Sequence, residues 1–477
     1  EARWHQLKRR IDVTQLGHST IPENFIHGPH QGNPAKSKSK ADKSKRQSSC
    51  ANKRYFGLKM ARLAVNGGNQ LYGDIPISGA KNAALPLLAG GLMSVGGTGL
   101  TLSNVPNLAD TRLMICLLKQ LGMTVQQDSG TVVISGAATN TDAPYELVSQ
   151  MRASILVMGP LLARYGEARV SLPGGCAIGS RPVDLHIRAM QKLGAIVELA
   201  DGYVQARTPD GLKGSKIIFP FVSVGATENA MMTACLATGT TQLVNAAREP
   251  EILDLAACLS AMGARISGAG TDVITIEGVP ALEPARHAVV ADRIEAGSYA
   301  IAVAMTGGDL CLKRMVPAHL ESLFDVMRQA GVNIEAGTDE VRVSSAGQYR
   351  GVDIETLPYP GFPTDLQAQF MAMMCLADGH SKICETIFEN RFMHVPELVR
   401  MGADIQVEGR IALVRGKVSL LPAPVRATDL RASVSLVLAA LATEGQSVIS
   451  DIYHLDRGYA GLDAKLEACG AVLQRLD

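Results

Sequence analysis

The chain has 477 residues, 47% of them hydrophobic and 19% charged, which is enough to bury a large core and to form more than one domain. Its formal charge of +1 is uneven, because residues 1–59 hold thirteen Lys or Arg against four Asp or Glu, about +9, and the rest carries about −8. A mildly acidic body argues against nucleic acid as the main partner, since proteins that bind phosphate backbones carry a basic stripe on the folded domain.

The nine cysteines are scattered singly, with no C-x-x-C pair and no grouping of Cys and His that is typical of a zinc site. This pattern predicts reduced thiols in a cytoplasmic protein, with no metal and no cofactor. The sequence has no run of eighteen apolar residues and no apolar signal-peptide core, so we expect no membrane partner.

Residues 1–59 are low in apolar residues and rich in like charge, which predicts a disordered basic extension. Met60 stands just before the first apolar alternation and is a candidate for the ancestral start. Three interpretations of the extension stay open: a targeting peptide, an arm that binds polyanions, and sequence upstream of the true start.

A helix-ending motif recurs six times after this extension. In each copy an amphipathic run ends in a Gly, followed by a small or apolar residue and the start of an apolar strand; the glycines are Gly122, Gly194, Gly263, Gly331, Gly402 and Gly470. A glycine in the left-handed conformation closes a helix, so each unit of about 70 residues is predicted to hold both a helix and strands. The fold class is therefore α/β, with six similar units.

Six units divide naturally into two domains of three, with a boundary near residue 290. The chain is rich in Ala, Leu and Met, but it has only nine Phe and one Trp. This composition predicts helices that pack closely through small side chains.

Several common catalytic motifs are absent from the sequence. It has no phosphate-binding P-loop, no G-x-G-x-x-G fingerprint, no G-x-S-x-G elbow and no H-E-x-x-H helix. Kinases, dehydrogenases, serine hydrolases and zinc proteases are therefore disfavoured.

Two segments place small or polar residues at a predicted helix start. Ser223-Val224-Gly225 leads into an apolar helix, where free backbone amides suit a diphosphate, although a plain Thr-capped helix explains the pattern equally well. Lys81 and Asn82 come directly before an Ala- and Leu-rich helix, and a lone Lys in such a place is usually a solvated surface residue.

The segment 172–182, LPGGCAIGSRP, combines three glycines, two flanking prolines, one thiol and one guanidinium. It predicts a loop that moves while its ends stay fixed, a lid. Cys176 is a candidate proton donor, and Arg181 nearby would depress the pKa of its thiol and make it nucleophilic. The alternative is an incidental thiol in a glycine-rich loop.

In the second half, Asp and Arg residues open several apolar helices. Singly, such residues are mostly helix caps and ion pairs. Their recurrence predicts convergence on one ligand with more than one negative group; the residues are Asp365, Arg391, Asp429, Arg431, Asp456 and Arg457.

With these segments in view, residues 61–477 closely resemble the UDP-N-acetylglucosamine 1-carboxyvinyltransferase family of enolpyruvyl transferases. The resemblance rests on long stretches that include SGAKNAALPLLAG, SLPGGCAIGSRPVDLHI, SVGATEN, FPTDLQAQF, ENRFMHVPEL, ATDLRASVSLVLA and YHLDRGY. It implies a two-domain inside-out α/β barrel with an active site in the interdomain cleft. Residues 81–290 would form the first domain, and residues 60–80 plus 291–477 the second.

The resemblance also implies the substrates and the residues that hold them. Cations for the phosphate and carboxylate of phosphoenolpyruvate would be Lys81, Arg181, Arg391, Arg431 and Arg457. The sugar nucleotide would contact Asn82, Arg152, Arg181, Pro182, Val183, Asp184, Leu185, His186, Ser223, Val224 and Gly225, and Ile387 would contact the amino sugar. Phe221 stands where some relatives have a Lys near the diphosphate.

By the same resemblance, the reaction adds the sugar hydroxyl to the enol carbon and then eliminates phosphate. Asp365 would be the base and Cys176 the thiol linked to proton delivery, covalent adduct formation and product release, and the catalytic set would further include Lys81, Arg391, Arg457 and Asp429. Two alternatives are an enolpyruvyl transferase for shikimate 3-phosphate and a non-catalytic paralogue that binds UDP-sugars. The expected assembly is a monomer or a weak homo-oligomer.

Overall fold

The computed structural model describes residues 61–172 and 183–476, which belong to one compact unit. The predicted basic extension and most of the predicted lid, including Cys176, Arg181 and Pro182, lie outside the described residues. No helix within the described ranges is both long enough and apolar enough to span a bilayer.

Six four-stranded sheets make up the strand content of the described residues. Each sheet has one parallel strand pair and two antiparallel pairs, in the same order. In the first half the sheets are β14(Ala285–Ala288), β3(Leu100–Ser103), β5(Thr131–Ser135), β4(Thr124–Asp128); β6(Asp142–Ala143), β7(Glu167–Ser171), β9(Tyr203–Arg207), β8(Ile196–Ala200); and β10(Lys216–Ile218), β11(Thr240–Val244), β13(Val273–Glu277), β12(Arg265–Ser267).

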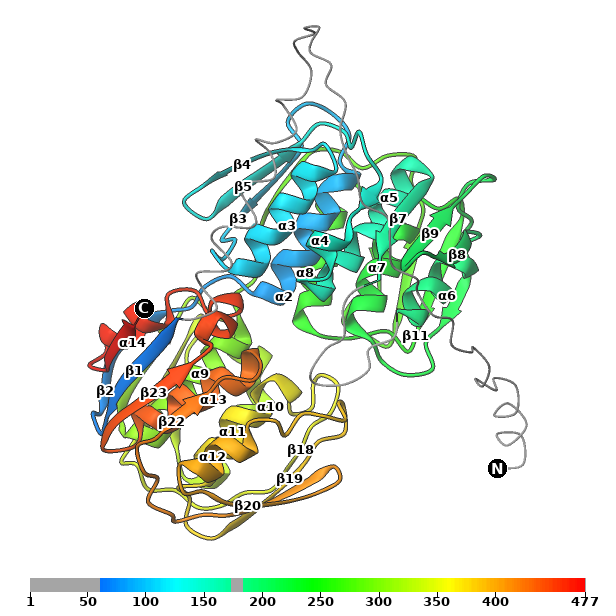
Figure 1. Ribbon diagram of the computed structural model, residues 1–477. Helices are drawn as coiled ribbons and strands as arrows, with labels where there is room; N and C mark the ends of the chain where they lie inside the picture. The colour runs from blue at the N-terminus through cyan, green and yellow to red at the C-terminus, as the bar shows by residue number, and fades with distance from the viewer. Residues whose placement is uncertain (1–60, 173–182, 477) are drawn as a thin grey trace, which may run out of the picture. The chain divides into compact units, whose positions relative to one another are not determined.

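The sheets of the second half repeat this order and include the two earliest strands of the chain. They are β2(Leu71–Pro76), β15(Gly308–Lys313), β17(Glu340–Ser345), β16(Asn333–Ala336); β18(Ile354–Glu355), β19(His380–Cys384), β21(Ile411–Arg415), β20(Asp404–Glu408); and β22(Pro424–Arg426), β23(Gly445–Ser450), β1(Arg62–Gly67), β24(Val472–Leu476). Figure 1 shows β1 and β2, in blue, beside the orange β23 and the red α14.

Helices connect the strands. The α-helices are α2(Lys81–Gly90), α3(Ala109–Gln120), α4(Tyr145–Val148), α5(Met158–Tyr165), α6(Asp184–Lys192), α7(Val224–Ala234), α8(Pro250–Ala261), α9(Arg293–Thr306), α10(Glu321–Ala330), α11(Gln367–Met374), α12(Val395–Arg400), α13(Leu430–Leu441) and α14(Leu462–Glu467). Short 3₁₀ turns are η1(Gly91–Met93), η2(Arg152–Val157), η3(Pro317–Leu320), η4(Thr364–Leu366) and η5(Ile452–Arg457).

The six predicted glycines all follow a helix and all have left-handed φ angles between +96° and +103°. Only glycine takes this conformation at little cost, so each one stops its helix and turns the chain into the next strand. The strands that follow, β4, β8, β12, β16, β20 and β24, each lie at the edge of a sheet. The prediction of six similar α/β units is confirmed.

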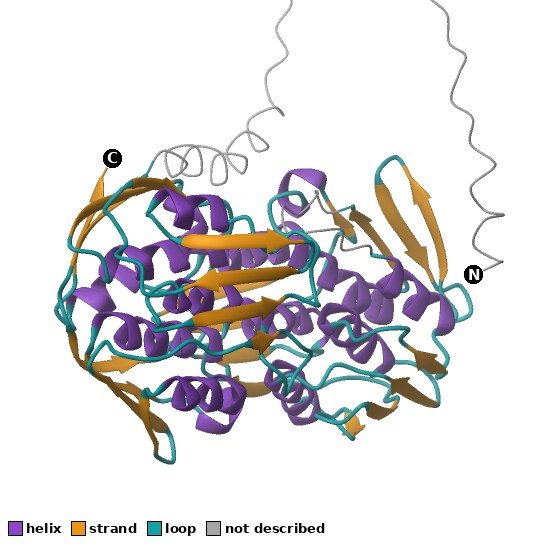
Figure 2. Ribbon diagram, turned by 90° about the horizontal axis from the view of Figure 1, so that it is seen from below, coloured by secondary structure: helices purple, strands orange, loops and turns teal. Residues whose placement is uncertain are grey.

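Strands flank a core of helices, whereas shorter helices such as α6 and α12 lie partly exposed (Figure 2). Every residue of α9 from Arg293 to Met305 is buried, and α13 is buried from Arg431 to its end. Between α5 and α7, a methyl group added at Gly159 would lie 2.2 Å from Oδ1 of Asn229, so a small residue lets these two helices approach closely, as the composition predicted.

Buried apolar side chains form two separate clusters. The first runs from Ala80 to Val289, and the second joins Leu63–Ile77 to Ile294–Leu473. The chain crosses between the clusters at two adjacent places, where Gly79 pairs with Ala291.

Candidate active site

Residues from both halves of the chain line a cavity of about 710 Å³. Six cationic side chains and four carboxylates surround it, a net charge of +2; they are Lys81, Arg152, Arg391, Arg426, Arg431 and Arg457, with Asp110, Asp365, Asp429 and Asp451. Burial lowers the pKa of the lining His454 to about 4, so this ring adds no charge near neutral pH. The cavity therefore suits a ligand with at least two negative charges.

Asp110, near the start of α3, binds two of these cations. Its Oδ2 lies 3.0 Å from Nζ of Lys81, the first residue of α2. Its Oδ1 accepts a hydrogen bond of 2.9 Å from Nε of Arg457, at the end of η5. Because α2 and α3 belong to the first half and η5 to the second, Asp110 joins the two halves at the cavity.

Burial and neighbouring charges act in opposite directions on this group. Burial raises the pKa of Asp110, but Lys81 and Arg457 outweigh it and hold the pKa below the ordinary value. Burial lowers the pKa of Lys81, and the positive charges of Arg431 and Arg457 lower it further, while Asp110 raises it. Asp110 is thus an anion at neutral pH, and Lys81 releases its proton more readily than an exposed lysine.

Asp365, in η4, is held in the same way by two arginines. Its Oδ1 accepts a hydrogen bond of 2.7 Å from Nη2 of Arg391, and its Oδ2 accepts one of 2.7 Å from Nη2 of Arg431. The two guanidinium groups are almost fully buried, whereas the Asp365 side chain is 26% exposed. The carboxylate therefore faces the cavity from a fixed position.

Glu385 fixes the two turns that carry Asp365 and Arg391. Its Oε2 accepts a hydrogen bond of 2.9 Å from the Thr364 hydroxyl, and its Oε1 accepts bonds from the backbone N–H groups of Ile387 and Phe388. The Arg391 guanidinium lies 5.4 Å from the centre of the Phe388 ring. The buried Glu385 thus connects the turn that carries Asp365 to the turn that leads to Arg391.

Asp429 is the N-cap of α13 and lines the cavity. Its Oδ1 accepts hydrogen bonds from the backbone N–H groups of Arg431 at 2.8 Å and Ala432 at 3.1 Å. This cap satisfies amides that would otherwise lack partners and fixes the helix start from which Arg431 extends.

A second group of predicted residues lies around the start of α7. His186, on α6, places its Nδ1 3.0 Å from the Asn229 side-chain nitrogen, and burial lowers its pKa to about 4, with Arg152 lowering it further. A Cβ at Gly225 would lie 3.4 Å from the imidazole, an ordinary contact distance, so the start of α7 packs directly against His186. Ser223 caps α7 by accepting a hydrogen bond from Ala226.

Comparison with known proteins places the chain in a family. Residues 65–466 match the family model of EPSP synthase (3-phosphoshikimate 1-carboxyvinyltransferase). UDP-N-acetylglucosamine 1-carboxyvinyltransferase of Gluconacetobacter diazotrophicus is 57% identical over 87% of this chain and all of its own length, and that of Caulobacter vibrioides is 54% identical. The chain belongs to the UDP-N-acetylglucosamine 1-carboxyvinyltransferases within this family.

Solved structures agree with this membership. The enolpyruvyl transferase NikO from Streptomyces tendae matches with a TM-score of 0.77 and 25% identity, over 87% of this chain and 99% of its own. EPSP synthase from Acinetobacter baumannii matches with a TM-score of 0.69 and 16% identity, over 87% of this chain and all of its own, which bears on the fold alone. The predicted enolpyruvyl transferase fold is therefore confirmed.

The cavity of this 1-carboxyvinyltransferase brings together eight of the predicted site residues, from both halves of the chain: Lys81, Asn82, Arg152, Asp365, Arg391, Asp429, Arg431 and Arg457. The remaining described ones do not line it. They are Val183, Asp184, Leu185, His186, Ser223, Val224, Gly225 and Ile387. Arg152 lines the cavity and its charge lowers the pKa of His186, which connects the residues around α7 to the cavity.

Asp110 was missed by the sequence interpretation. In the sequence it is a single acidic residue in the first turn of a helix, a position that usually reflects the helix dipole. Its 2% exposure and its two cationic partners come from distant parts of the chain, so no local signal marks it.

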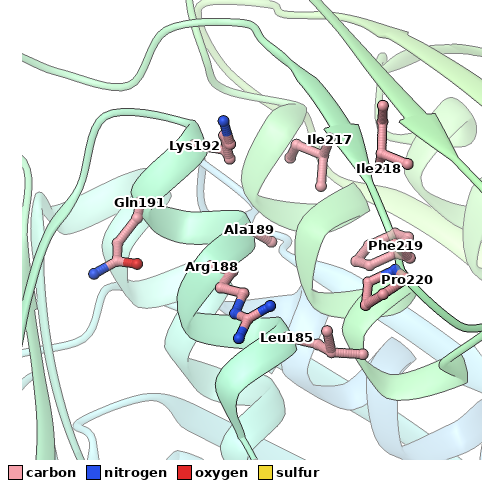
Figure 3. Close-up of a pocket in the computed structure, with 9 residues that line it drawn as sticks. All are labelled: Leu185, Arg188, Ala189, Gln191, Lys192, Ile217, Ile218, Phe219 and Pro220. Carbon is pink, nitrogen blue, oxygen red and sulfur yellow. The ribbon is translucent and has the colours of Figure 1, made fainter. Parts of the chain in front are cut away.

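A second hollow of about 440 Å³ lies between α6 and residues 217–220 (Figure 3). Of the predicted site residues, only Leu185 lines it. Phe221, the expected departure from some relatives, is 56% exposed. Among the described residues, no group of three or more His, Cys, Asp or Glu side chains could hold a metal ion.

Proposed function

We propose that this enzyme transfers the enolpyruvyl group of phosphoenolpyruvate to the 3′-hydroxyl of UDP-N-acetylglucosamine and releases phosphate. This reaction commits the sugar nucleotide to peptidoglycan synthesis. The observation that carries the proposal is the pair of aspartates, Asp110 and Asp365, each held between two cations in one cavity of net positive charge. The names of relatives identical at 54–57% support the choice of acceptor.

Phosphoenolpyruvate carries a phosphate and a carboxylate, and fixed guanidinium groups suit both. Lys81, Arg391, Arg431 and Arg457 supply the described cations, and Arg181 is a further candidate from the sequence. Since their positions are set by Asp110, Asp365 and Asp429 before any ligand binds, little reorganisation is needed during the reaction.

The reaction has two stages. The sugar hydroxyl adds to C2 of the enol, losing its proton to a base while C3 gains a proton, and a tetrahedral phosphate ketal forms. The ketal then loses a proton from its methyl group, the carbon–oxygen bond to phosphate breaks, and the enol ether product forms. Asp365 is our candidate for the base and Cys176 for the thiol that delivers the proton.

Alignment of two bound substrates lowers a barrier by roughly 7–11 kcal/mol, whereas acid and base steps contribute ~10²–10⁴-fold each.

The two buried clusters are our candidate domains, 81–290 and 60–80 plus 291–477, with the cavity between them. The finer assignments of Asn82, Arg152, residues 181–186, residues 223–225 and Ile387 to the sugar nucleotide belong to this proposal.

The proposal includes a cytoplasmic enzyme that acts as a monomer or weak homo-oligomer, without a nucleic-acid or membrane partner and without a cofactor.

A phosphate-release assay tests the proposal. Phosphate is expected when both phosphoenolpyruvate and UDP-N-acetylglucosamine are present, and not with either alone. Release with shikimate 3-phosphate as acceptor would assign the enzyme to the other branch of the family. Binding of UDP-N-acetylglucosamine without phosphate release would make the chain a non-catalytic paralogue.

A pair of isosteric variants separates the base from a general effect of lost charge. Asp365→Asn is expected to lower kcat by ~10²–10⁴-fold, because it removes the proton acceptor. Asp325→Asn, which breaks an exposed ion pair with Arg328, should leave kcat unchanged. Equal activity of both variants would exclude Asp365 as the base.

A further inference from the structure

Three polar side chains form a buried network that contacts Nη1 of Arg431, whereas Nη2 of Arg431 binds the Asp365 carboxylate. They are Tyr459, which follows η5, Ser298 on α9 and Gln369 on α11. Their exposures are 3%, 0% and 0%, inside the apolar cluster of the second half. Polar groups in such surroundings are costly unless each is hydrogen-bonded, so their presence needs a reason.

The hydrogen bonds of this network have a defined direction. The Ser298 hydroxyl donates to the carbonyl of Ile294 at 2.8 Å, which uses its single proton. The Tyr459 hydroxyl, 3.0 Å away, must therefore donate to Ser298, and its oxygen accepts a bond of 3.2 Å from Nη1 of Arg431. Burial raises the pKa of Tyr459, so the phenol keeps the proton that this arrangement requires.

Gln369 supports the same arrangement from a second side. Its side-chain nitrogen lies 3.2 Å from both the Tyr459 and the Ser298 hydroxyl oxygens. It also donates to the backbone carbonyl of Asp365 at 2.9 Å. The Gln369 amide thus connects Tyr459 and Ser298 to the backbone of Asp365, whose carboxylate binds Arg431.

Arg431 connects this hydrogen-bond network to the Asp365 carboxylate in the cavity. Its Nη1 is held by Tyr459, and its Nη2 donates to Oδ2 of Asp365 at 2.7 Å. A planar guanidinium bound at two nitrogens cannot rotate about its long axis without breaking a bond. The phenol therefore fixes the angle at which Arg431 meets the carboxylate.

We propose that Tyr459 is a positioning residue of the transfer reaction, whose hydroxyl, with Ser298 and Gln369 behind it, holds Arg431 in the orientation that fixes Asp365. This inference rests on the proposed function, because it assumes that Asp365 reacts. A phenylalanine would fill the same volume in the apolar cluster, so packing alone does not call for the hydroxyl.

Tyr459→Phe tests the inference, with Tyr349→Phe as its matched control. Tyr349 is also buried in the second cluster, but its hydroxyl donates to the backbone carbonyl of Met373 and not to the site. Loss of a bond to a charged group predicts a fall in kcat of about 10-fold for Tyr459→Phe, with the KM for UDP-N-acetylglucosamine changed less than about twofold. Tyr349→Phe should keep the wild-type kcat.

A second variant and a crystal structure keep the test independent of a folding defect. Ser298→Ala leaves the phenol in place and removes its acceptor, so a smaller fall in kcat is expected. In a crystal structure of Tyr459→Phe, the contact between Nη2 of Arg431 and Oδ2 of Asp365 should be longer than 2.7 Å or lost. Wild-type kcat in Tyr459→Phe, or an unmoved guanidinium, would overturn the inference.

These readouts also distinguish it from the proposed function. If the wild-type protein releases no phosphate with both substrates, the proposed function fails, and the position of Arg431 in the variant structure still decides whether Tyr459 holds it. If the wild-type protein is active and Tyr459→Phe is equally active, only the positioning role fails.

Discussion

Asp110 shows how one buried carboxylate organises a site. It is held by Lys81 and Arg457 at 3.0 and 2.9 Å, and Arg457 lies 347 positions after it in the chain. Breaking a buried ion pair on one side leaves the remaining charges uncompensated, which costs more than the pair contributed.

Asp110→Asn is therefore expected to lower kcat/KM for phosphoenolpyruvate by about 10- to 100-fold, the range for lost bonds between charged groups. Asp110 raises the pKa of Lys81, so its removal should also shift the alkaline limb of the pH–rate profile to lower pH. Steady-state kinetics across pH check both effects. Asp404→Asn, on an exposed ion pair with Arg415, is the control. An unchanged alkaline limb would contradict the role assigned to Lys81 and Asp110.

Cys176 lies outside the described residues, so its role is a prediction from the sequence. The epoxide antibiotic fosfomycin, which alkylates this thiol in the family that the chain resembles, is expected to abolish phosphate release and to add one adduct to the peptide that contains Cys176. Mass spectrometry checks the site. Cys176→Ala should escape the adduct, whereas Cys116→Ala, at an exposed cysteine of α3, should still form it. Full activity after treatment of the wild-type protein would argue against the predicted thiol.

At the scale of elements, close helix packing places the residue that we propose as the base. Gly297 on α9 faces η4, and a Cβ there would lie 2.6 Å from Cδ1 of Leu366, the neighbour of Asp365. The missing side chain is what lets α9 and η4 approach.

Gly297→Ala is expected to destabilise the protein by about 1–3 kcal/mol, because the extra methyl overpacks a filled core. It should also lower kcat, since Leu366 would push on Asp365. Gly90→Ala is the matched control. Gly90 is also helical, and the nearest atom to its added Cβ is Sδ of Met232 at 4.0 Å. The free energy of unfolding of this variant is therefore expected to rise by about 0.5–1 kcal/mol. Urea unfolding of both variants gives the free energies. Equal stability of the two would mean that the α9–η4 contact adjusts without strain.

Element ends were the part of the fold that the sequence predicted best. The six glycines that were expected to close helices have nearly identical φ angles, because that turn needs a residue without a Cβ. Local patterns gave no such signal for the pairing of β1 and β2 with strands that come more than 200 residues later, and residues 60–80 were joined to the second half only through the family resemblance.

At the scale of the whole molecule, buried histidines tie stability to pH. Burial lowers the pKa of His186 and of His394 to about 4. An unfolded histidine titrates near 6.5, so between pH 6.5 and 4 the unfolded state binds more protons than the folded state. The free energy of unfolding must therefore fall as the pH falls through this window, and these groups have no effect above it.

His186→Asn should remove the contribution of one titrating group to this pH dependence. Asparagine keeps an acceptor near the position of Nδ1, which faces the Asn229 amide, but it does not titrate. As the pH is lowered from 7.5 to 4, the free energy of unfolding of the variant is expected to rise by up to about 3 kcal/mol relative to that of the wild-type protein. Urea unfolding at several pH values measures it, with His380→Asn, at an exposed histidine, as the control. Parallel curves for wild type and His186→Asn would show that His186 does not resist protonation.

The sequence alone determined the α/β class, the six units, the family and most of the charged residues around the cavity, because helix ends, repeats and motifs are local patterns. Only the tertiary structure decided which charges meet. Asp110 between Lys81 and Arg457, and Tyr459 behind Arg431, depend on contacts between segments far apart in the chain. A local pattern records the chemistry of a side chain, but its partners and its burial are set when the core forms around it.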